Sequence, residues 1–494
     1  MATVGLTAGH GHDDRMRFPP PGHFRTAATF RAHLRELGVD FDCDDSTVAH
    51  GALAQPIRVA GKTLDNRFCA HPMEGWDGTE GGSPTAHTQR RWRHFGRSGA
   101  ALVWGGEAFA VQQDGRANKN QLCLHRDSER DLSLLLTELR AGRREISASD
   151  DGVLIGLQLT HSGRFARPLG PFAPKITQHH PLLAKKYALP ATTPLLTDTE
   201  LEAIGEQFVR AAVTAERAGF DFVDVKCCHG YLLHELLASK TRNGTYGGPA
   251  LASRMRLFER IVAGIRTACP NLHIGVRLSA ADVAPYGKDE STGRGTALTD
   301  QGIDLANHHF NFLPDATAST LDLDEATAFL QRCTELSIEL CNVTLGSPYW
   351  NPHLQRPAAY PPSDGYLPPL DPLHCVATHL RVTRQLTQSV KGMAFVGTGY
   401  TYLQEWLPHV AQRAVANGEV TFVGIGRMLL SYPELPADVI AGRALQQKRL
   451  CRTFSDCTTA PRNGMVSGCF PLDPYYRALP EADHLKQRKR DQGT

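Results

Sequence analysis

The distribution of apolar residues along the chain predicts its fold. Eight short runs rich in Val, Ile, Leu and Phe are separated by longer amphipathic stretches. Because these runs do not alternate with polar residues, we expect parallel strands that are buried on both faces. The predicted strands cover residues 67–73, 101–106, 153–159, 220–225, 273–278, 338–344, 393–399 and 420–426.

The stretches between these runs predict helices. The clearest covers residues 198–218, where apolar residues recur every three or four positions. We expect Asp198 to cap its start and Gly219 to end it. Eight strands alternating with helices predict an α/β fold, a (β/α)8 TIM barrel, in which chemistry gathers at the carboxyl ends of the strands. The residues that close each run are therefore candidates for function.

The strand pattern also suggests how the chain is organised. We expect an N-terminal extension over residues 1–50 with a short helix near 29–37, a barrel over 51–445 and a Cys-containing tail over 446–494. Loops longer than about 15 residues tend to form lids or binding loops. Three long Pro-rich loops of this kind are predicted at 167–194, 282–321 and 347–370.

Composition and charge narrow the function. Lys and Arg total 53 against 51 Asp and Glu, so no strong field favours nucleic acid or an anionic membrane. The chain has neither a long apolar run nor a basic and then apolar leader, so we expect a cytoplasmic protein that acts on a small molecule. Its 12 cysteines are expected to be reduced. His10 and His12 could bind a metal, although a polar terminal segment is the favoured interpretation.

Two glycine clusters follow the last two predicted strands. They are Gly397-Thr398-Gly399 and Gly424-Ile425-Gly426-Arg427. Barrels often hold a phosphate on backbone amides in these two loops. Neither cluster is a GxGxxG motif, so a Rossmann site is not supported. Each cluster alone could simply turn the chain, but both together with the Arg427 cation favour a phosphorylated cofactor or substrate.

Six longer motifs carry a family resemblance. They are NRFCAHPMEGW, IGLQLTHSGR, AGFDFVDVKCCHGYLLHELL, YGGPALASRMRLFERIVAGIR, IGVRLSAAD and VGIGRMLLSYPEL. In order and spacing the chain resembles, from about residue 66 to 435, the Old Yellow Enzyme family of FMN-dependent NADH:flavin oxidoreductases. The resemblance includes the branch related to 2,4-dienoyl-CoA reductase. Because the chain ends about 20 residues after Tyr475, we expect the FAD and NAD(P) domains of some members of that branch to be absent.

The resemblance implies an FMN site. Arg277 matches a guanidinium near N1 of the flavin, where a fixed cation stabilises the charge of the reduced ring. Glu74 lies where a carboxylate would disfavour reduced flavin unless it were paired, so we expect a partner such as an arginine. The residues that match the family's cofactor positions are Pro72, Met73, Glu74, Ala108, Gln158, Arg277, Gly399, Gly426 and Arg427.

The segment KCCHGY matches the family's catalytic positions with one departure. In the family, two His, or a His and an Asn, hold the carbonyl oxygen of an activated alkene, and a Tyr protonates the α carbon. His229 and Tyr231 match, but the first position is Lys226. A lysine could stabilise a developing enolate as a point charge, admit carboxylate-bearing substrates or favour dehydrogenation. Cys227 and Cys228 are expected to pack as small apolar side chains.

The tail resembles, incompletely, the iron-sulfur segment of the same branch. That segment has a C-x2-C-x3-C-x11-C pattern, whereas Cys451, Cys457 and Cys469 are spaced C-x5-C-x11-C. Because full ligation of a cluster usually takes four cysteines, a cluster here is doubtful and we expect no bound metal. The segment would then be a structural cap, and NAD(P)H would reduce FMN directly.

Several further residues are weaker candidates. We expect some of them to shape the site, and those after the sixth strand to select the substrate; the set is His71, Trp76, Asp77, Glu107, His161, Asn342, Tyr349, Trp350 and His353. The favoured function is NAD(P)H-driven reduction of an activated C=C bond, as in enones or enoates. The alternatives are oxidation of a C–N bond, as in trimethylamine dehydrogenase, and a non-catalytic barrel that binds FMN or another phosphorylated ligand. A homo-oligomer is compatible with each of these.

Overall fold

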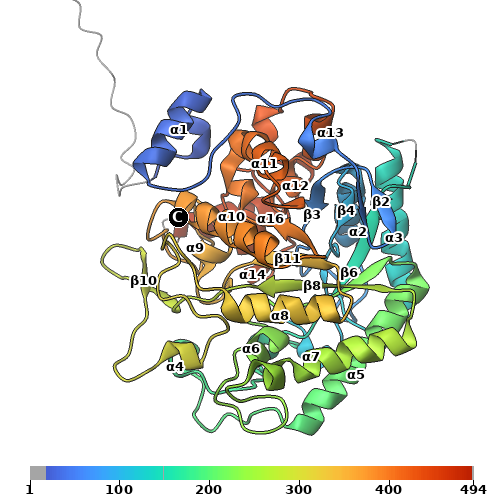
Figure 1. The fold of residues 1–494 in the computed structure, drawn as a ribbon, viewed down its shortest axis with the longest axis vertical. Helices are drawn as coiled ribbons and strands as arrows, with labels where there is room; N and C mark the ends of the chain where they lie inside the picture. Colours follow the sequence, from blue (N-terminus) through green and yellow to red (C-terminus); the bar gives the residue numbers. More distant parts are fainter. Residues whose placement is uncertain (1–17, 148, 492–494) are drawn as a thin grey trace, which may run out of the picture.

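The computed structural model describes residues 18–147 and 149–491, and a closed ring of eight parallel strands lies at its centre (Figure 1). Pairing of β13 with β3 and of β4 with β6 completes the ring, and β5 (Ala108–Ala110) adds to β6. Each predicted strand overlaps an observed one, so the predicted (β/α)8 barrel is confirmed. In order around the ring the strands are β3 (Phe68–Ala70), β4 (Leu102–Val103), β6 (Leu154–Thr160), β7 (Phe222–Val225), β8 (His273–Ser279), β11 (Leu340–Thr344), β12 (Ala394–Gly397) and β13 (Phe422–Ile425).

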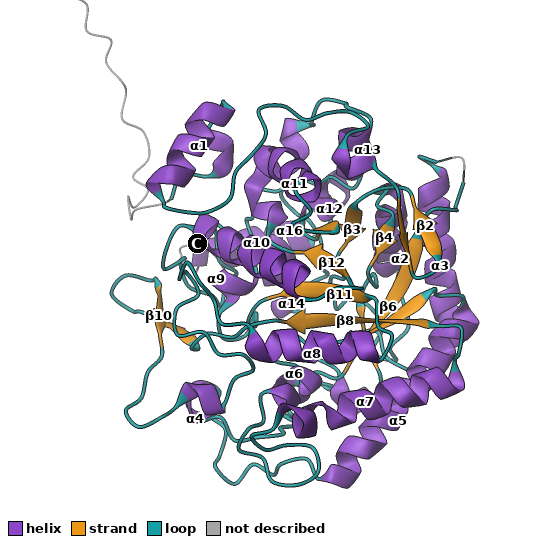
Figure 2. Cartoon of the chain, viewed as in Figure 1, coloured by secondary structure: helices purple, strands orange, loops and turns teal. Residues whose placement is uncertain are grey.

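Helices surround this ring and cover the outer faces of the strands (Figure 2). Every residue of β6 is buried, as expected for a parallel strand covered on both sides. The surrounding helices are α2 (Ala86–Arg97), α3 (Ser128–Arg144), α5 (Asp198–Ala218), α7 (Leu251–Ala268), α8 (Asp324–Glu335), α10 (Pro372–Ser389), α11 (Leu407–Ala416), α12 (Met428–Ser431) and α13 (Leu435–Ile440). None of the helices in the described part of the chain is long and apolar enough to cross a membrane.

Helix α5 has the predicted extent but a different cap. Thr197, one residue earlier than expected, accepts a hydrogen bond from the Glu200 backbone at 3.2 Å, while Glu200 accepts one from the Thr197 backbone at 2.7 Å. The prediction that Asp198 is the cap is therefore wrong, because Asp198 accepts a hydrogen bond from Arg242 at 2.8 Å instead. Gly219 ends the helix with a φ of 100°, as predicted.

The N-terminal extension is attached to the barrel through aromatic side chains. Its predicted helix is α1 (Ala27–Glu36), and Phe30 of this helix stacks on Trp406 with a centroid distance of 5.0 Å. Trp406 also donates a hydrogen bond to the Pro21 carbonyl at 3.1 Å. His10 and His12 lie outside the described residues.

The long predicted loops and the tail contain short elements of their own. In Figure 2, the arrow of β8 points toward the side of the molecule where β10 and α9 lie, which is the carboxyl side of the barrel. Together with β1 (Ile57–Val59), β2 (Lys62–Leu64) and α6 (Leu232–Leu237), which lie elsewhere, the remaining strands and α-helices of the described chain are α4 (Pro181–Lys186), β9 (Tyr286–Lys288), β10 (Gly295–Ala297), α9 (Pro352–Gln355), α14 (Asp456–Arg462), α15 (Pro474–Arg477) and α16 (Glu481–Asp491).

Candidate functional site

A cavity opens at the carboxyl ends of the strands and encloses about 1210 Å³, including its open mouth. Ala108 is the one predicted cofactor residue outside its lining; it is buried in β5, opposite Gln158. The structure brings together the other predicted catalytic and cofactor residues, which are Pro72, Met73, Glu74, Gln158, Lys226, His229, Tyr231, Arg277, Gly399, Gly426 and Arg427.

One end of the cavity gathers three arginines, Arg356, Arg427 and Arg462. Arg427 donates to the Pro357 carbonyl at 2.7 Å, and its Nη1 is buried without a partner. Arg356 donates to the Thr458 hydroxyl, and its Nη2 is likewise buried without a partner. Burial, together with the charges of Arg462 and Arg427, lowers the pKa of Arg356 to about 9. Such unsatisfied cationic donors fit a phosphate group.

His71 packs against the glycine loops that follow the last two strands. A side chain at Gly424 would place its Cβ 2.1 Å from the His71 ring, so only glycine fits there. Thr398 donates to the Val343 carbonyl at 2.6 Å, so its hydroxyl accepts from His71 Nε2 at 3.2 Å, and His71 Nδ1 accepts from the Asn342 amide at 3.1 Å. Burial lowers the pKa of His71 well below its ordinary value. A neutral His71 therefore supports both glycine loops.

Asp224 organises the middle of the cavity from beneath. Its carboxylate accepts hydrogen bonds from Gln158 Nε2 at 2.6 Å, from Trp104 at 2.8 Å and from the Arg277 backbone at 2.7 Å. The contact with Asp224 fixes the Gln158 amide nitrogen, which leaves its carbonyl oxygen as an acceptor. Arg277 Nε is buried without a partner. Both groups fit the flavin ring that the family resemblance implies. Sequence analysis did not identify Asp224, although the residue lies inside a predicted strand.

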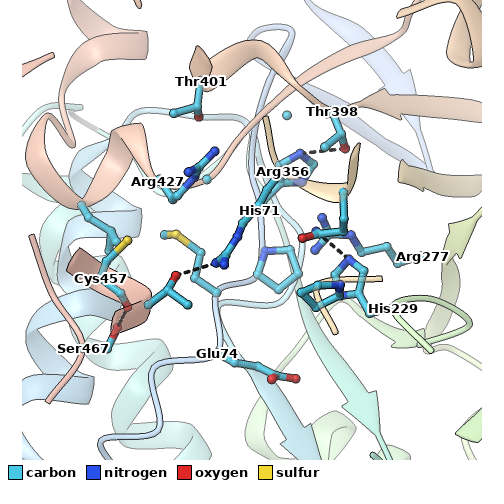
Figure 3. Close-up of a pocket in the computed structure, with 18 of the residues that line it drawn as sticks. His71, Glu74, His229, Arg277, Arg356, Thr398, Thr401, Arg427, Cys457 and Ser467 are labelled. Carbon is cyan, nitrogen blue, oxygen red and sulfur yellow. Dashed lines mark hydrogen bonds between the residues drawn. The ribbon is translucent and has the colours of Figure 1, made fainter. Parts of the chain in front are cut away.

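The same cavity carries the predicted catalytic residues, and Figure 3 labels Glu74 and His229 among them. Lys226 Nζ lies 2.9 Å from one oxygen of Glu74, and Tyr231 donates to the other oxygen at 2.7 Å. The Tyr349 hydroxyl is 3.0 Å from that of Tyr231. Burial and the Glu74 charge raise the pKa of Tyr231 well above its ordinary value. The expectation of an arginine as the partner of Glu74 is thus wrong, because Lys226, which directly follows β7, pairs with it instead.

His229 is held in an uncommon backbone conformation, with a φ of 67°. Its N–H donates to Ser279 at 3.0 Å, and its carbonyl accepts from Ser347 at 2.7 Å. The Gln355 amide nitrogen lies 3.1 Å from His229 Nε2, so the ring proton is on Nδ1. Burial lowers the pKa of His229 well below its ordinary value, which makes the imidazole a neutral donor.

A buried ionic cluster positions the loop that carries Glu74. Glu107 accepts from the Gly75 backbone at 2.8 Å and from Arg91 at 2.7 Å, and Arg91 also pairs with Asp77. Asp77 and Glu107 therefore support the site from behind, whereas Trp76 lines the cavity.

The remaining candidates divide between the cavity and the layer behind it. Tyr349 lines the cavity, whereas Trp350 packs behind Phe165, and His353 is hydrogen-bonded to Tyr366 at 2.7 Å. His161 is buried outside the lining.

The tail forms part of the cavity wall, which the sequence did not predict. Cys457 lies in the lining, while Cys451 is buried, and within residues 18–147 and 149–491 no group of three His, Cys, Asp or Glu side chains is arranged to hold a metal. Cys227 and Cys228 are fully buried, as expected. The tail residues in the wall are Cys457, Thr458, Pro461, Arg462 and Ser467.

Comparisons with known proteins agree with this site. The model of the NADH:flavin oxidoreductase / NADH oxidase family matches residues 52–319. An NADPH dehydrogenase of Bacillus subtilis (strain 168) is 30% identical over 262 residues, which cover 51% of this chain and 71% of the relative. The fold is similar to that of 2-naphthoyl-CoA reductase in complex with 2-naphthoyl-CoA, with a TM-score of 0.63, 17% identity and coverage of 88% and 58%. It is also similar to morphinone reductase in complex with tetrahydroNAD, with a TM-score of 0.53, 19% identity and coverage of 80% and 92%.

Proposed function

Given that the chain belongs to the NADH:flavin oxidoreductase / NADH oxidase family, we propose that it is an FMN-dependent enzyme that uses NAD(P)H to reduce an activated C=C bond. The observation that carries this proposal is the convergence of Lys226, His229 and Tyr231 in the wall of a single cavity that the arginine cluster also lines. A carrier of FMN would not need a proton donor beside two groups that can hold a carbonyl oxygen.

The lining of the cavity supplies groups that suit the phosphate and the ring of FMN. Arg356 and Arg427 would hold the phosphate through their unsatisfied N–H groups, beside Gly399 and Gly426 in the same lining. Arg277 would lie at the ring, where its cation favours the reduced state. The chemistry that FMN supplies when bound is hydride transfer from NAD(P)H to the β carbon of the alkene.

The protein side chains have separate roles in the proposed reaction. The His229 Nδ1–H and a free N–H of the Lys226 ammonium would bind the carbonyl oxygen of the substrate and withdraw electrons from the alkene. The Tyr231 hydroxyl would then donate its proton to the α carbon, which requires it to turn away from Glu74. Tyr349, 3.0 Å away, is placed to return a proton to Tyr231.

The test separates the two half-reactions of the Tyr231→Phe variant in anaerobic stopped-flow measurements. Reduction of the flavin by NADPH is expected to stay within about twofold of the wild-type rate, whereas reoxidation by 2-cyclohexenone should slow by about a hundredfold or more. Tyr475→Phe is the matched control, because Tyr475 is 37% exposed and lies outside the cavity lining.

Three outcomes contradict the proposal. An equal fall in the rates of both half-reactions in Tyr231→Phe would show that Tyr231 is not the proton donor. A purified protein that takes up no FMN would overturn the cofactor assignment. A flavin that an amine reduces, but that no activated alkene reoxidises, would favour the oxidation of a C–N bond instead.

A further inference from the structure

We propose that His234 is a positioning residue of this reaction, which holds the turn that carries His229, and that Asp282 fixes the tautomer in which His234 does so. This inference rests on the proposed function and adds two residues that do not line the cavity. His234 lies in α6, directly after the catalytic segment, and Asp282 follows β8 at the carboxyl end of the barrel. Both side chains are 1% exposed.

The turn at His229 and Gly230 needs support, because both residues have positive φ angles, of 67° and 76°. This left-handed conformation is unfavourable for a residue with a side chain, such as His229. A side chain at Gly230 would also place its Cβ 2.2 Å from the Trp350 ring, so the backbone is closely packed on that side. The position of the His229 imidazole in the cavity lining therefore depends on this backbone conformation.

His234 supplies a hydrogen-bond acceptor for this turn. Its Nδ1 accepts from the Gly230 backbone N–H at 2.8 Å. A backbone N–H can only donate, so Nδ1 carries no proton and the proton of the ring is on Nε2. The ring also stacks on Trp350, with a centroid distance of 6.1 Å and an interplanar angle of 21°. His234 therefore holds the N–H of Gly230 while it packs on the tryptophan that covers the same glycine.

Asp282 favours this tautomer of His234. The distance from His234 Nε2 to Asp282 Oδ2 is 3.3 Å, and because the two groups are not aligned as a hydrogen bond, their attraction is electrostatic. Burial alone would raise the pKa of Asp282, but His234 and His309 outweigh it and hold that pKa below its ordinary value. A charged carboxylate beside Nε2 stabilises a proton there and disfavours a lone pair.

The same carboxylate belongs to a longer chain of buried contacts. Asp282 Oδ2 accepts from His309 Nδ1 at 3.3 Å, and His309 Nε2 lies 3.1 Å from His180 Nε2. Nδ1 of His180 accepts from the Leu183 backbone at 3.4 Å, so His180 donates through Nε2 to His309. Each of the three rings thus carries one proton, with no conflict between donors. Because His180 and His309 come from two of the long predicted loops, the chain links both loops to the turn.

The test compares His234→Phe with His234→Asn in the FMN-loaded protein. Phe keeps an aromatic ring against Trp350 but has no acceptor, whereas Asn loses the ring but can place an oxygen where Nδ1 lies. Packing and hydrogen bonding therefore rank the two variants in opposite order. The measured quantities are the free energy of unfolding in urea, the deuterium exchange rate of the Gly230 amide and the rate at which 2-cyclohexenone reoxidises the flavin. The matched control is His94→Phe, because His94 is half-buried on the outer helix α2 and does not line the cavity.

We expect His234→Phe to raise the exchange rate of the Gly230 amide and to slow reoxidation, each by about tenfold or more, because the turn loses its acceptor. In His234→Asn both rates should stay within about threefold of the wild type, although this variant unfolds more easily than His234→Phe. His94→Phe should leave both rates unchanged. Equal rates in the two His234 variants, or rates that follow their stabilities, would overturn the inference.

A measurement on the wild type keeps the inference testable if a variant does not fold. Nitrogen chemical shifts of the histidine side chains report the tautomer of each ring, and coupling across the hydrogen bond to the Gly230 amide identifies His234. We expect the proton on Nε2, and a proton on Nδ1 would refute the role of Asp282. The two proposals fail in different ways. If no activated alkene reoxidises the wild-type flavin, the proposed function is wrong, whereas the amide exchange rates and the tautomer still decide whether His234 holds the turn.

Discussion

Replacement of Arg356 by Leu is expected to weaken the binding of FMN while leaving that of riboflavin nearly unchanged. Arg356 follows α9 in a long loop, and its Nη2 is buried without a hydrogen-bond partner in the wall of the cavity. Riboflavin has the same ring as FMN but no phosphate. The comparison of the two flavins therefore isolates the interaction that Arg356 would make with the phosphate.

The size of the effect depends on two opposing terms. A hydrogen bond to a charged group contributes about 1.5–3 kcal/mol, which corresponds to about 10- to 150-fold in Kd. In the protein without ligand, however, burial and, after it, the charges of Arg462 and Arg427 lower the pKa of Arg356 to about 9. Removing one of three clustered cations relieves that repulsion, so we expect the lower end of the range, about tenfold.

Both Kd values are measured by titrating each flavin with apoprotein and monitoring the quenching of flavin fluorescence. The matched control is Arg126→Leu, because the Arg126 side chain is 93% exposed and does not line the cavity. Equal weakening of FMN and riboflavin binding by Arg356→Leu would show that the variant damages the cavity as a whole. An unchanged Kd for FMN would place the phosphate elsewhere and refute the reasoning.

Two further predictions concern packing and protonation. Gly424→Ala should lower the free energy of unfolding by about 1–3 kcal/mol and reduce FMN uptake, since its Cβ would lie 2.1 Å from the His71 ring. Urea unfolding measures the effect, with Gly81→Ala as the control, because the new Cβ there meets only Thr79 at 3.6 Å. Equal stabilities of the two variants would contradict the prediction. Burial lowers the pKa of His379 to about 4, below the value of about 6.5 in the unfolded chain, so stability present above pH 6.5 is lost as the pH falls toward 4. Between pH 7 and pH 5 the free energy of unfolding of the His379→Gln variant should therefore fall by about 2 kcal/mol less than that of the wild type. Urea unfolding at the two pH values measures this difference. Equal falls in both proteins would refute the prediction.

The strands could be predicted because their signal is local. A parallel strand covered on both faces needs an unbroken apolar run, and the sequence around Leu154–Thr160 has one whatever its neighbours are. The N-terminal cap of α5, in contrast, could not be predicted from the local sequence. Thr197 and Asp198 are both good capping residues, and only the backbone, extended at Thr197, decides which one caps the helix.

The site residues at strand ends were also predictable, because barrel topology brings all carboxyl ends to one face. The partner of Glu74 could not be predicted, since it depends on which side chain from the end of another strand reaches Glu74. Lys226 is 152 residues away in the chain, and no spacing rule connects the two. Gln355 ends the short helix α9 and Arg356 follows it, in a segment whose sequence has no periodic pattern to indicate its conformation.

The arginine cluster has a consequence for the tail. Arg427 follows β13, Arg356 belongs to the loop after β11, and Arg462 ends α14 of the tail, where it pairs with Asp364. Three cations from separate segments repel one another unless an anion lies between them. A phosphate at this position would stabilise the docked tail by the same free energy with which the docked tail stabilises the phosphate, because linkage is reciprocal. The segment predicted as a structural cap contributes to the wall of the cavity, and we expect its attachment and ligand binding to be coupled.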